Sequence, residues 1–314
     1  MEVFFTVFES VIVLLGIGLI GFYIIGKKIV PQQALGVLSP LVLDIALPSL
    51  IFFNIVTTFN PSETQDWWLL PLWWLFFTGI LLVLTFVFRY VSQQKTRNEF
   101  SISLFFQNGI FFPIAILTGM FGESSSYLVA LFLFTLFFPA LFFNTYHLFF
   151  RQSKQHISIK KILNPVLIAT VIALSISLFG VQNYIPGFLV SIFSLVGAIA
   201  LPGIMLVIGG NIYLDFKNKG RFYFSEVAKF VVIKNVVFPL IFLLILYIIR
   251  PPYYIALLLL LQSAVPPVTA VSIFTSRAGG NQSLVNQFIV ASFLLSLLSI
   301  PIMIELFSMI FPAP

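Results

Sequence analysis

Apolar stretches alternate with short polar or proline- and glycine-containing clusters along the whole chain. None of these stretches alternates apolar and polar residues with a period of two, so the pattern favours helices over the strands of a membrane barrel. A helix of about 20 apolar residues is long enough to cross the hydrocarbon core of a bilayer. The pattern therefore predicts about ten transmembrane helices, at approximately 4–25, 36–59, 68–90, 100–119, 126–149, 162–180, 186–214, 227–249, 253–275 and 284–311.

The composition favours an integral membrane protein. Of the 314 residues, 60% are hydrophobic and only 8% are charged, whereas soluble domains are about half apolar and about a quarter charged. Because the predicted spans leave only short connections, we expect no separate soluble domain. The chain has no cysteine, which excludes thiolate catalysis, cysteine-bound metals and disulfides.

Basic residues gather in every second connection between the predicted spans. These connections hold 14 of the 16 lysines and arginines: Lys27, Lys28, Arg89, Lys95, Arg97, Arg151, Lys154, Lys160, Lys161, Lys217, Lys219, Arg221, Lys229 and Arg277. The alternate connections hold Glu63, Asp66, Glu123 and a single basic residue, Arg250. The positive-inside rule then predicts cytoplasmic basic connections and two external termini. The net charge of +6 is thus interpreted as a topology signal, and we expect no nucleic-acid partner.

One four-residue motif occurs in both halves of the chain. Ile45-Ala46-Leu47-Pro48 in the second predicted span recurs as Ile199-Ala200-Leu201-Pro202 in the seventh. With five spans in each half, the second copy enters the membrane from the opposite side. The sequence therefore predicts an all-α membrane protein built of two inverted five-helix repeats, 1–150 and 151–314, a plan common among secondary transporters.

Prolines interrupt the fourth and ninth predicted spans. Proline lacks a backbone donor and leaves the carbonyl four residues earlier without its helical partner. Pro113 thus frees the Gly109 carbonyl, and Pro266-Pro267 free those of Gln262-Ser263. Within a membrane, such groups occur where protein or a water-filled cavity satisfies them. We therefore predict broken helices that form a binding site, with a plain kink as the alternative.

Polar residues flank both predicted breaks. The candidate substrate-binding residues there are Gln107, Asn108, Gly109, Pro113, Gln262, Ser263, Pro266 and Pro267. Thr269 is a candidate for ion or proton coupling, because its hydroxyl is one of the oxygens that a cation site would need.

Several short motifs resemble the auxin efflux carrier family. They are the Ala-Leu-Pro-Ser-Leu-Ile-Phe run at 46–52, the Asn-Gly pair before Pro113, Lys234 followed by Pro239, and Pro266-Pro267 before the turn at 276–281. The family includes plant auxin exporters and bacterial malate or malonate permeases, and its wider superfamily includes bile-acid/sodium symporters. The short connection at 150–161 is similar to that of the prokaryotic, malate/malonate permease-like members, whereas Phe111-Phe112 replace the glycines that members usually carry there.

The resemblance implies a scaffold and a moving transport domain. Helices 1, 2, 6 and 7, at about 1–59 and 162–216, would form the scaffold. Helices 3–5 and 8–10, at about 66–150 and 227–314, would form the transport domain, with broken helices 4 and 9 crossing at its centre. The resemblance also implies a homodimer joined through the scaffold helices, in a prokaryotic plasma membrane.

A few polar residues inside the predicted spans need an explanation, because a charge at the bilayer centre is costly. Lys234 and its neighbour Asn235 in the eighth span are candidate substrate ligands, and so is Asn144 in the fifth. Asp44 in the second span is a candidate for proton or cation coupling. A purely structural role is the alternative for each.

Three further residues lie near the predicted membrane surfaces. We expect Glu305, His147 and His156 to be solvated there rather than to take part in chemistry.

The leading hypothesis is a secondary active transporter that moves a small organic anion by elevator-type alternating access. The anion would be a carboxylate, either auxin-like or a dicarboxylate. We expect no cofactor, and the superfamily implies coupling to H⁺ or Na⁺. The alternatives are a sodium-coupled, bile-acid-like symporter, a channel, or an intramembrane enzyme. The last two are disfavoured, since the sequence has no His-Glu-x-x-His, Gly-x-Ser-x-Gly or Thr-Val-Gly-Tyr-Gly motif.

Overall fold

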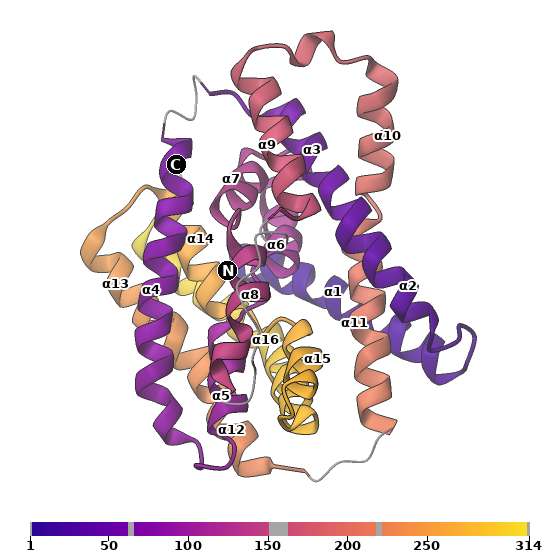
Figure 1. The fold of residues 1–314 in the computed structure, drawn as a ribbon. Helices are drawn as coiled ribbons and strands as arrows, with labels where there is room; N and C mark the ends of the chain where they lie inside the picture. The colour runs from indigo at the N-terminus through magenta and orange to yellow at the C-terminus, as the bar shows by residue number, and fades with distance from the viewer. Residues whose placement is uncertain (1, 62–65, 151–162, 218–221, 313–314) are drawn as a thin grey trace.

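The computed structural model describes residues 2–61, 66–150, 163–217 and 222–312. In these ranges every regular element is a helix, and the backbone carries one isolated β-bridge. Figure 1 shows the helices in two groups, one toward the right of the view and the other toward its left and centre.

The first group contains the helices at the beginning of each half of the chain. They are α1 (Glu2–Gly26), α2 (Ala34–Pro40), η1 (Leu41–Ala46), α3 (Leu47–Thr58), α9 (Pro165–Leu178), η6 (Gln182–Tyr184), α10 (Gly187–Gly197) and α11 (Ala200–Lys217). Within this group α1 packs along α11, and α3 packs against α9 and α10.

The second group contains the remaining helices of each half. From the first half come η2 (Trp67–Leu69), α4 (Leu70–Phe88), η3 (Arg89–Val91), α5 (Arg97–Phe105), α6 (Phe111–Phe121), α7 (Ser126–Phe134), α8 (Phe138–Thr145) and η4 (Tyr146–Phe149). From the second half come α12 (Phe224–Val232), η7 (Ile233–Val237), α13 (Phe238–Ile249), α14 (Tyr253–Ala264), α15 (Ala270–Arg277) and α16 (Gln282–Ile310). The long helix α16 packs against α12, α14 and α15, and also against α1 of the first group.

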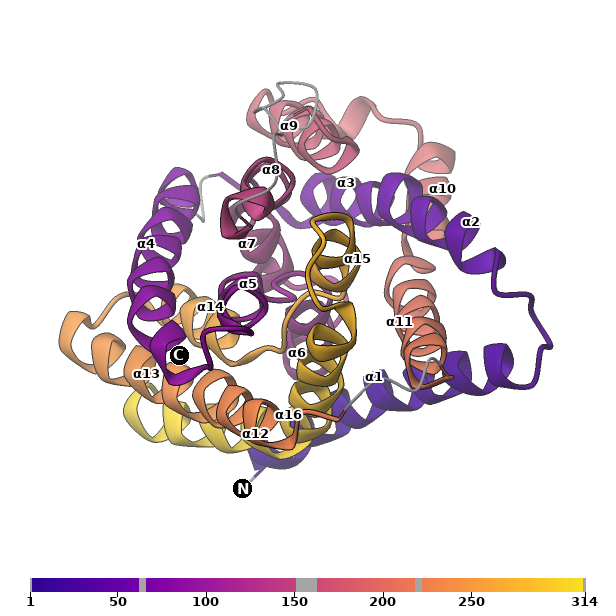
Figure 2. The ribbon, with the colours of Figure 1, turned by 60° about the horizontal axis from the view of Figure 1, so that its bottom comes forward.

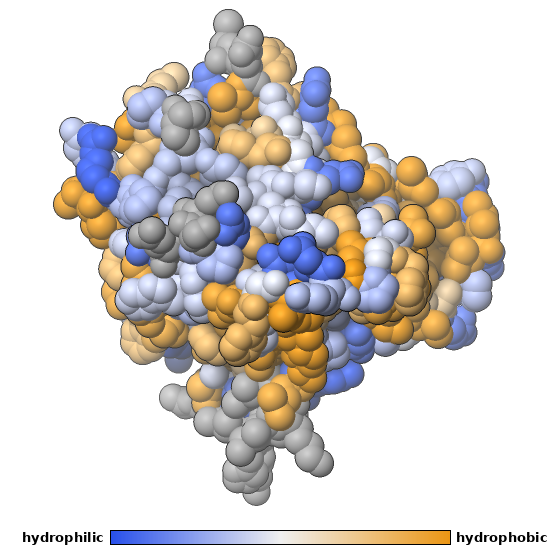
Figure 3. All heavy atoms as spheres, turned by 90° about the horizontal axis from the view of Figure 1, so that it is seen from above, coloured by the Kyte–Doolittle hydropathy of each residue, from blue (hydrophilic) through white to orange (hydrophobic). Residues whose placement is uncertain are grey.

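Seven helical ranges in the described part of the chain are long and apolar enough to cross a membrane. Three shorter apolar helices, α6, α9 and α14, accompany them. Many large hydrophobic side chains are exposed on the outside, for example Val83 on α4 and Leu195 on α10. Figure 3 looks down on one end of the molecule and shows hydrophobic residues along much of its rim. Such a surface is suited to lipid, and the chain is an integral membrane protein.

Two turns of π-helix keep long helices continuous ahead of a proline. In η1, before Pro48, the Leu47 N–H donates to the Val42 carbonyl five residues earlier. In η7, before Pro239, the Phe238 N–H donates to the Ile233 carbonyl in the same way. Because the wider turn absorbs the irregularity that a proline causes, helix continues on both sides of it.

Glycines allow α1 and α11 to approach each other closely. A Cβ atom on Gly21 would overlap the backbone of Leu206, and a Cβ atom on Gly209 would overlap that of Gly18. Small residues permit this backbone-to-backbone packing between helices in lipid. The first group is therefore joined along α1 and α11 by contacts that leave no space for larger side chains.

Two buried carboxylates connect helices within the second group. Glu226 on α12 accepts a hydrogen bond from the Ser92 hydroxyl at 2.6 Å and pairs with Lys229 at 2.9 Å. Glu99 on α5 accepts from the backbone N–H of Asn281 at 2.8 Å, just before α16. Buried carboxylates with such partners fix the positions of the connections that they contact.

The basic connections that the structure describes gather toward one end of the molecule. The lower half of Figure 1 holds the α1–α2 and α4–α5 connections, the end of α11 and the start of α12. The α9–α10 connection lies at the top of the view. Figure 2 brings this lower end forward. Some of the residues named above lie outside the described residues: Arg151, Lys154, Lys160, Lys161, Lys219, Arg221, Glu63 and His156. The orientation in the membrane stays a prediction.

Glu305 and His147, two of the residues expected at the membrane surface, lie in different surroundings. Glu305 on α16 accepts a hydrogen bond from the backbone N–H of Phe4 at 3.1 Å, where a carboxylate also complements the positive N-terminal end of α1. His147 is buried, so the expectation that it is solvated was wrong. The tertiary packing of η4 against α5 and α15 covers this residue.

Candidate functional site

Two interrupted helices meet at the centre of the second group. α5 ends at Phe105 and α6 begins at Phe111, while α14 ends at Ala264 and α15 begins at Ala270. The non-helical segments 106–110 and 265–269 lie against each other in antiparallel orientation. We call this contact the crossing.

Backbone hydrogen bonds hold the crossing together. Gln107 and Pro267 form the isolated β-bridge. The Asn108 N–H donates to the Pro266 carbonyl at 2.8 Å, and the Val268 N–H donates to the Phe106 carbonyl at 3.0 Å. Groups that a continuous helix would pair internally are thus satisfied by the other broken helix, as burial in a membrane protein requires.

The Gln262 side chain completes the backbone contacts on one side of the crossing. Its Nε2 donates to the Gly109 carbonyl at 2.6 Å, and its Oε1 accepts from Gln107 Nε2 at 3.2 Å. The Gly109 carbonyl is the one that Pro113 deprives of a helical partner. A Cβ atom on Gly109 would overlap the Gln262 amide, so this contact requires glycine.

Lys234 reaches the other side of the crossing from η7. Its ammonium donates to the Ser263 carbonyl at 3.2 Å, and the side chain is completely buried. The Ser263 carbonyl is the group that Pro267 deprives of its helical partner. A buried lysine amino group therefore lies directly against one broken helix, and its Nζ is 5.9 Å from the centre of the Phe238 ring.

Asn235 is directed away from the crossing. Its Nδ2 donates to the Ser292 carbonyl at 3.1 Å, and its Oδ1 accepts from the Ser292 hydroxyl at 2.7 Å. The two neighbours thus differ in role, since Lys234 contacts α14 and Asn235 joins η7 to α16.

A cavity of about 290 Å³ lies between the two helix groups. Its walls come from α2, η1 and α11 of the first group and from Thr269, α15 and α16 of the second. This volume is near the lower limit for small-molecule sites, about 300 Å³. Aliphatic side chains form most of the lining, and its polar residues are Ser39, Asn211, Thr269, Ser272, Gln282 and Asn286.

The cavity adjoins the crossing. Thr269 is the last residue of the non-helical segment 265–269, and Ala270 in the first turn of α15 also lines the cavity. The N-terminal end of a helix carries a partial positive charge and attracts anions. The lining therefore offers neutral hydrogen-bonding groups and the partial positive charge at the start of α15, where the N–H groups of Val271 and Ser272 already donate to the Val268 and Thr269 carbonyls.

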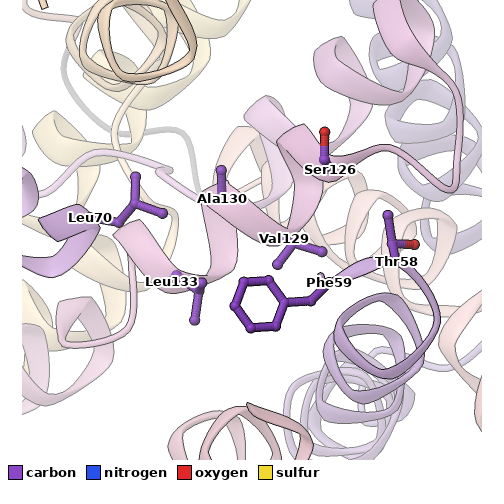
Figure 4. Close-up of a pocket in the computed structure, with 7 residues that line it drawn as sticks. All are labelled: Thr58, Phe59, Leu70, Ser126, Val129, Ala130 and Leu133. Carbon is purple, nitrogen blue, oxygen red and sulfur yellow. The ribbon is translucent and has the colours of Figure 1, made fainter. Parts of the chain in front are cut away.

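A second pocket is too small for an organic substrate. It lies between the end of α3 and the starts of α4 and α7, where Figure 4 shows Thr58 and Ser126 at its edge and Phe59 beside Val129. Its free volume is about 10 Å³, which is about the space of one water molecule.

Comparison with protein families decides the class of the chain. A model described as a membrane transport protein matches residues 6–156 and 144–304, and these ranges include both broken helices. The chain belongs to this membrane transport protein family. The match confirms the family that the resemblance to auxin efflux carriers indicated. A search of curated proteins found no match to the chain.

Other candidate residues of this membrane transport protein lie away from the crossing. Asn144 is buried on α8, where its Nδ2 donates to the Ala140 carbonyl of its own helix at 2.9 Å. Asp44 is exposed on η1, and the residue before it, Leu43, lines the cavity.

Phe111-Phe112 are buried in the transport protein at the start of α6. The Phe112 ring packs edge-on against Phe293 of α16, with 4.6 Å between the ring centres. Neither ring is among the residues that line the 290 Å³ cavity. Phe112 thus fills space between α6 and α16.

Sequence reasoning missed most of the cavity lining. Asn211, Gln282 and Asn286 are single polar residues in apolar helices, and they line one cavity only because α11 and α16 face each other across it. Spacing along α16 offers a weak signal, since Gln282 and Asn286 are four residues apart and share a helix face.

Proposed function

We propose that this membrane transport protein is a secondary active transporter that moves a small organic anion across the membrane by elevator-type alternating access. The single observation that carries the proposal is the crossing of two broken helices beside a cavity that separates the two helix groups. Crossed or broken helices next to a cavity are how secondary transporters expose backbone groups and helix ends to substrates.

The two helix groups correspond to the proposed scaffold and transport domain. The scaffold would comprise about 1–59 and 162–216, and the transport domain about 66–150 and 227–314, as two inverted five-helix repeats. Close glycine packing of α1 against α11 supports a rigid scaffold. The carboxylates of Glu226 and Glu99, which join helices of the second group, support a transport domain that moves as one body.

A carboxylate is the anion that the cavity favours. The start of α15 provides the positive end of a helix dipole, and Thr269 and Asn211 provide neutral hydrogen-bonding groups. Lys234 lies behind the crossing rather than in the cavity lining, so we propose that it acts through its field and not as a direct ligand.

Sodium coupling is the main alternative. A sodium site needs several converging oxygens, and Gln107, Ser263 and Thr269 are the candidates. One of these oxygens is already engaged, since the Ser263 carbonyl accepts from Lys234. Gln107 is held through its Nε2, which donates to Gln262, and that bond does not engage its Oε1. We propose coupling to H⁺ as the first possibility to test, with Asp44 on η1, next to the cavity-lining Leu43, and Lys234 at the crossing as the candidate charged groups.

We also propose the setting in which the transporter works. Basic connections on one end support a plasma-membrane protein with both termini outside, and the short connection at 150–161 supports a prokaryotic origin. A homodimer through the scaffold helices follows from the family resemblance. Channel and enzyme functions are less well supported, because a cavity between two helix groups fits alternating access better than a continuous pore or a catalytic cluster.

Reconstitution into proteoliposomes tests the proposal. Uptake of a panel of monocarboxylates and dicarboxylates, including aromatic acids, is measured with and without proton or sodium gradients. We expect saturable uptake of at least one acid, and faster uptake when the same acid is preloaded inside. Flux that rises linearly without saturation would indicate a channel, and no flux or binding of any acid would refute the anion assignment.

A further inference from the structure

Two arginines at the connection between α4 and α5 surround one exposed tyrosine. The guanidinium carbon Cζ of Arg89 lies 5.9 Å from the centre of the Tyr90 ring, and that of Arg97 lies 4.8 Å from it. The hydrogen bonds and ion pairs found among the described residues include neither guanidinium. Each Nε is covered by protein, whereas the terminal Nη atoms are not. Two permanent positive charges therefore share one ring and keep donors open to an anion.

Arg250, after α13, shows the same stacking with its donors satisfied. Its Cζ is 4.5 Å from the centre of the Tyr247 ring. Its guanidinium also donates to the Tyr247 carbonyl at 3.0 Å and to the Ile310 carbonyl at 3.4 Å. Stacking on a tyrosine thus does not prevent an arginine of this chain from finding acceptors. The pair around Tyr90 differs because the described protein provides it with none.

The carboxylates nearest along the chain and in contact with this connection are engaged with other groups. Glu99 accepts from the backbone N–H of Asn281 at 2.8 Å. Glu226 accepts from the Ser92 hydroxyl and pairs with Lys229. Neither forms an ion pair with Arg89 or Arg97, and the neighbouring Lys95, which is exposed, adds a further positive charge. The surface around Tyr90 is therefore complementary to an anion.

An apolar groove lies on the outer face of α4, which is at the left of Figure 1. Its volume is about 400 Å³, and its lining is Phe76, Gly79, Ile80, Val83 and Leu84. Gly79 leaves a notch in this face, since a Cβ atom there would have no atom of the described residues within 4 Å. Tyr90 follows Val83 by seven residues, or two helical turns, so the groove and the tyrosine share one side of the helix.

The groove and the arginines together restrict the kind of ligand. A molecule that occupies both needs an anionic end and a long apolar body. Guanidinium groups bind phosphate oxygens well, because their planar set of donors matches the phosphate geometry. Exposed apolar side chains such as Val83 face lipid, and tyrosines are frequent at the level of the lipid headgroups. Basic pockets at this level recognise anionic headgroups.

We propose that Arg89, Arg97 and the groove on α4 bind an anionic phospholipid. Its phosphate accepts hydrogen bonds from the two guanidiniums beside Tyr90, and one acyl chain lies in the groove. None of these residues lines the 290 Å³ cavity. The lipid site is thus separate from the proposed transport path and does not depend on which substrate is carried.

Native mass spectrometry of the protein in a neutral detergent tests the inference. The dissociation constant of the first bound lipid is measured for dioleoyl phosphatidylglycerol and for dioleoyl phosphatidylcholine, which has the same chains but no net charge. We expect the wild-type protein to bind phosphatidylglycerol at least about tenfold more tightly, as charge-assisted hydrogen bonds would give. In the double variant Arg89→Gln/Arg97→Gln the two constants should become equal. Arg250→Gln, the matched control, should keep the preference.

Gly79→Leu tests the groove without changing any charge. The new side chain would fill the notch on the outer face, where no atom of the described residues opposes it, so we expect folded protein that has lost affinity for both lipids. Unfolding temperatures in detergent check that each variant is folded. Should the double variant unfold, Gly79→Leu and the comparison of the two lipids in the wild type still test the site.

The remaining outcomes would overturn the inference. They are equal binding of the two lipids by the wild type, a preference that survives in the double variant or is also lost in Arg250→Gln, and unchanged affinity in Gly79→Leu. Release of phosphatidylglycerol by millimolar inorganic phosphate would indicate a site for free phosphate instead of lipid. Failure of the protein to take up any acid would overturn the proposed function and leave the lipid site standing.

Discussion

At the scale of single residues, two carbonyl groups define the centre of this molecule. Gly109 and Ser263 each lack a helical donor because a proline stands four residues later. The Gly109 carbonyl accepts from the amide of Gln262, and the Ser263 carbonyl accepts from the ammonium of Lys234. The two breaks are therefore completed differently, by a side-chain amide in one case and by a lysine amino group in the other.

Removal of the Lys234 charge should impair transport more than folding. Lys234→Met leaves the Ser263 carbonyl without a donor, at a cost of about 1–3 kcal/mol, but it also removes a buried ammonium, which is costly to bury. We expect folded protein whose uptake rate of the transported acid is at least about tenfold lower, measured at equal amounts in proteoliposomes.

Lys229→Met is the matched control on the same helical segment. Its ammonium is partly exposed and pairs with Glu226, whose carboxylate also accepts from Ser92, Thr96 and the Gln93 N–H. Because these other bonds remain, we expect folded protein with nearly unchanged uptake. Equal uptake by Lys234→Met and Lys229→Met would show that the buried charge is structural.

Gly109→Ala should destabilise the crossing. The new methyl group would overlap the Gln262 amide and displace it from the Gly109 carbonyl, with a cost of about 1–3 kcal/mol in the free energy of unfolding. We expect a lower unfolding temperature in detergent. At Gly79 a methyl group meets nothing within 4 Å, so Gly79→Ala should not lower it. An unchanged unfolding temperature for Gly109→Ala would contradict the tight contact.

At the scale of elements, helix continuity depends on how each proline is accommodated. Pro48 and Pro239 follow π-helical turns and their helices continue. At the crossing, by contrast, the helix is interrupted at Pro266-Pro267 and in the segment before Pro113. The backbone can be non-helical there because the opposite broken helix supplies hydrogen-bond partners. Proline alone does not decide whether a helix forms a wide turn or breaks. The hydrogen-bond partners available to the freed backbone groups decide this.

Substitutions at two glycines of α1 test its close packing against α11. Gly21→Ala would place a methyl group against the backbone of Leu206, whereas at Gly16 no atom of the described residues would lie within 4 Å of it. We expect Gly21→Ala to lower the free energy of unfolding by about 1–3 kcal/mol through overpacking. Gly16→Ala should be neutral or slightly stabilising, and similar unfolding temperatures for the two variants would argue against the close approach.

At the scale of the whole molecule, two helix groups face each other across a cavity. The proposed mechanism requires them to move relative to each other, because the cavity lies between them and not within either group. The small pocket in Figure 4 lies at another point of their boundary, with Thr58 on α3 and Ser126 on α7. Linking these two residues would join the groups without occupying the larger cavity.

A reversible cross-link tests relative motion of the two groups. The chain has no cysteine, so Thr58→Cys with Ser126→Cys can be linked specifically by a short, reducible bifunctional reagent. We expect the cross-link to stop uptake and reduction to restore it. The control pair, Phe22→Cys with Tyr213→Cys, lies within the first group, where the ring centres are 5.2 Å apart. Its cross-link should leave uptake intact, and full activity of the linked Thr58–Ser126 pair would exclude motion at this boundary.

The pattern of apolar, polar and proline residues along the sequence was enough to predict several properties of this protein. Apolar stretches predicted the helical membrane fold, because each span must satisfy its own backbone and present an apolar surface to lipid. Short motifs such as Ala46 to Phe52 indicated the family that the family match confirmed. The carbonyls left free at Gly109 and Ser263 also followed from proline chemistry, which is local along the chain.

Only the tertiary structure decided which groups meet. The amide of Gln262 and the ammonium of Lys234 reach the two free carbonyls from distant positions, and Asn235, next to Lys234, instead contacts Ser292. The same packing buried His147 and placed Asn286 in the wall of the cavity. Periodicity and proline positions are local properties of the sequence, whereas partners and cavities depend on how non-adjacent helices pack, and that packing sets the chemistry of the site.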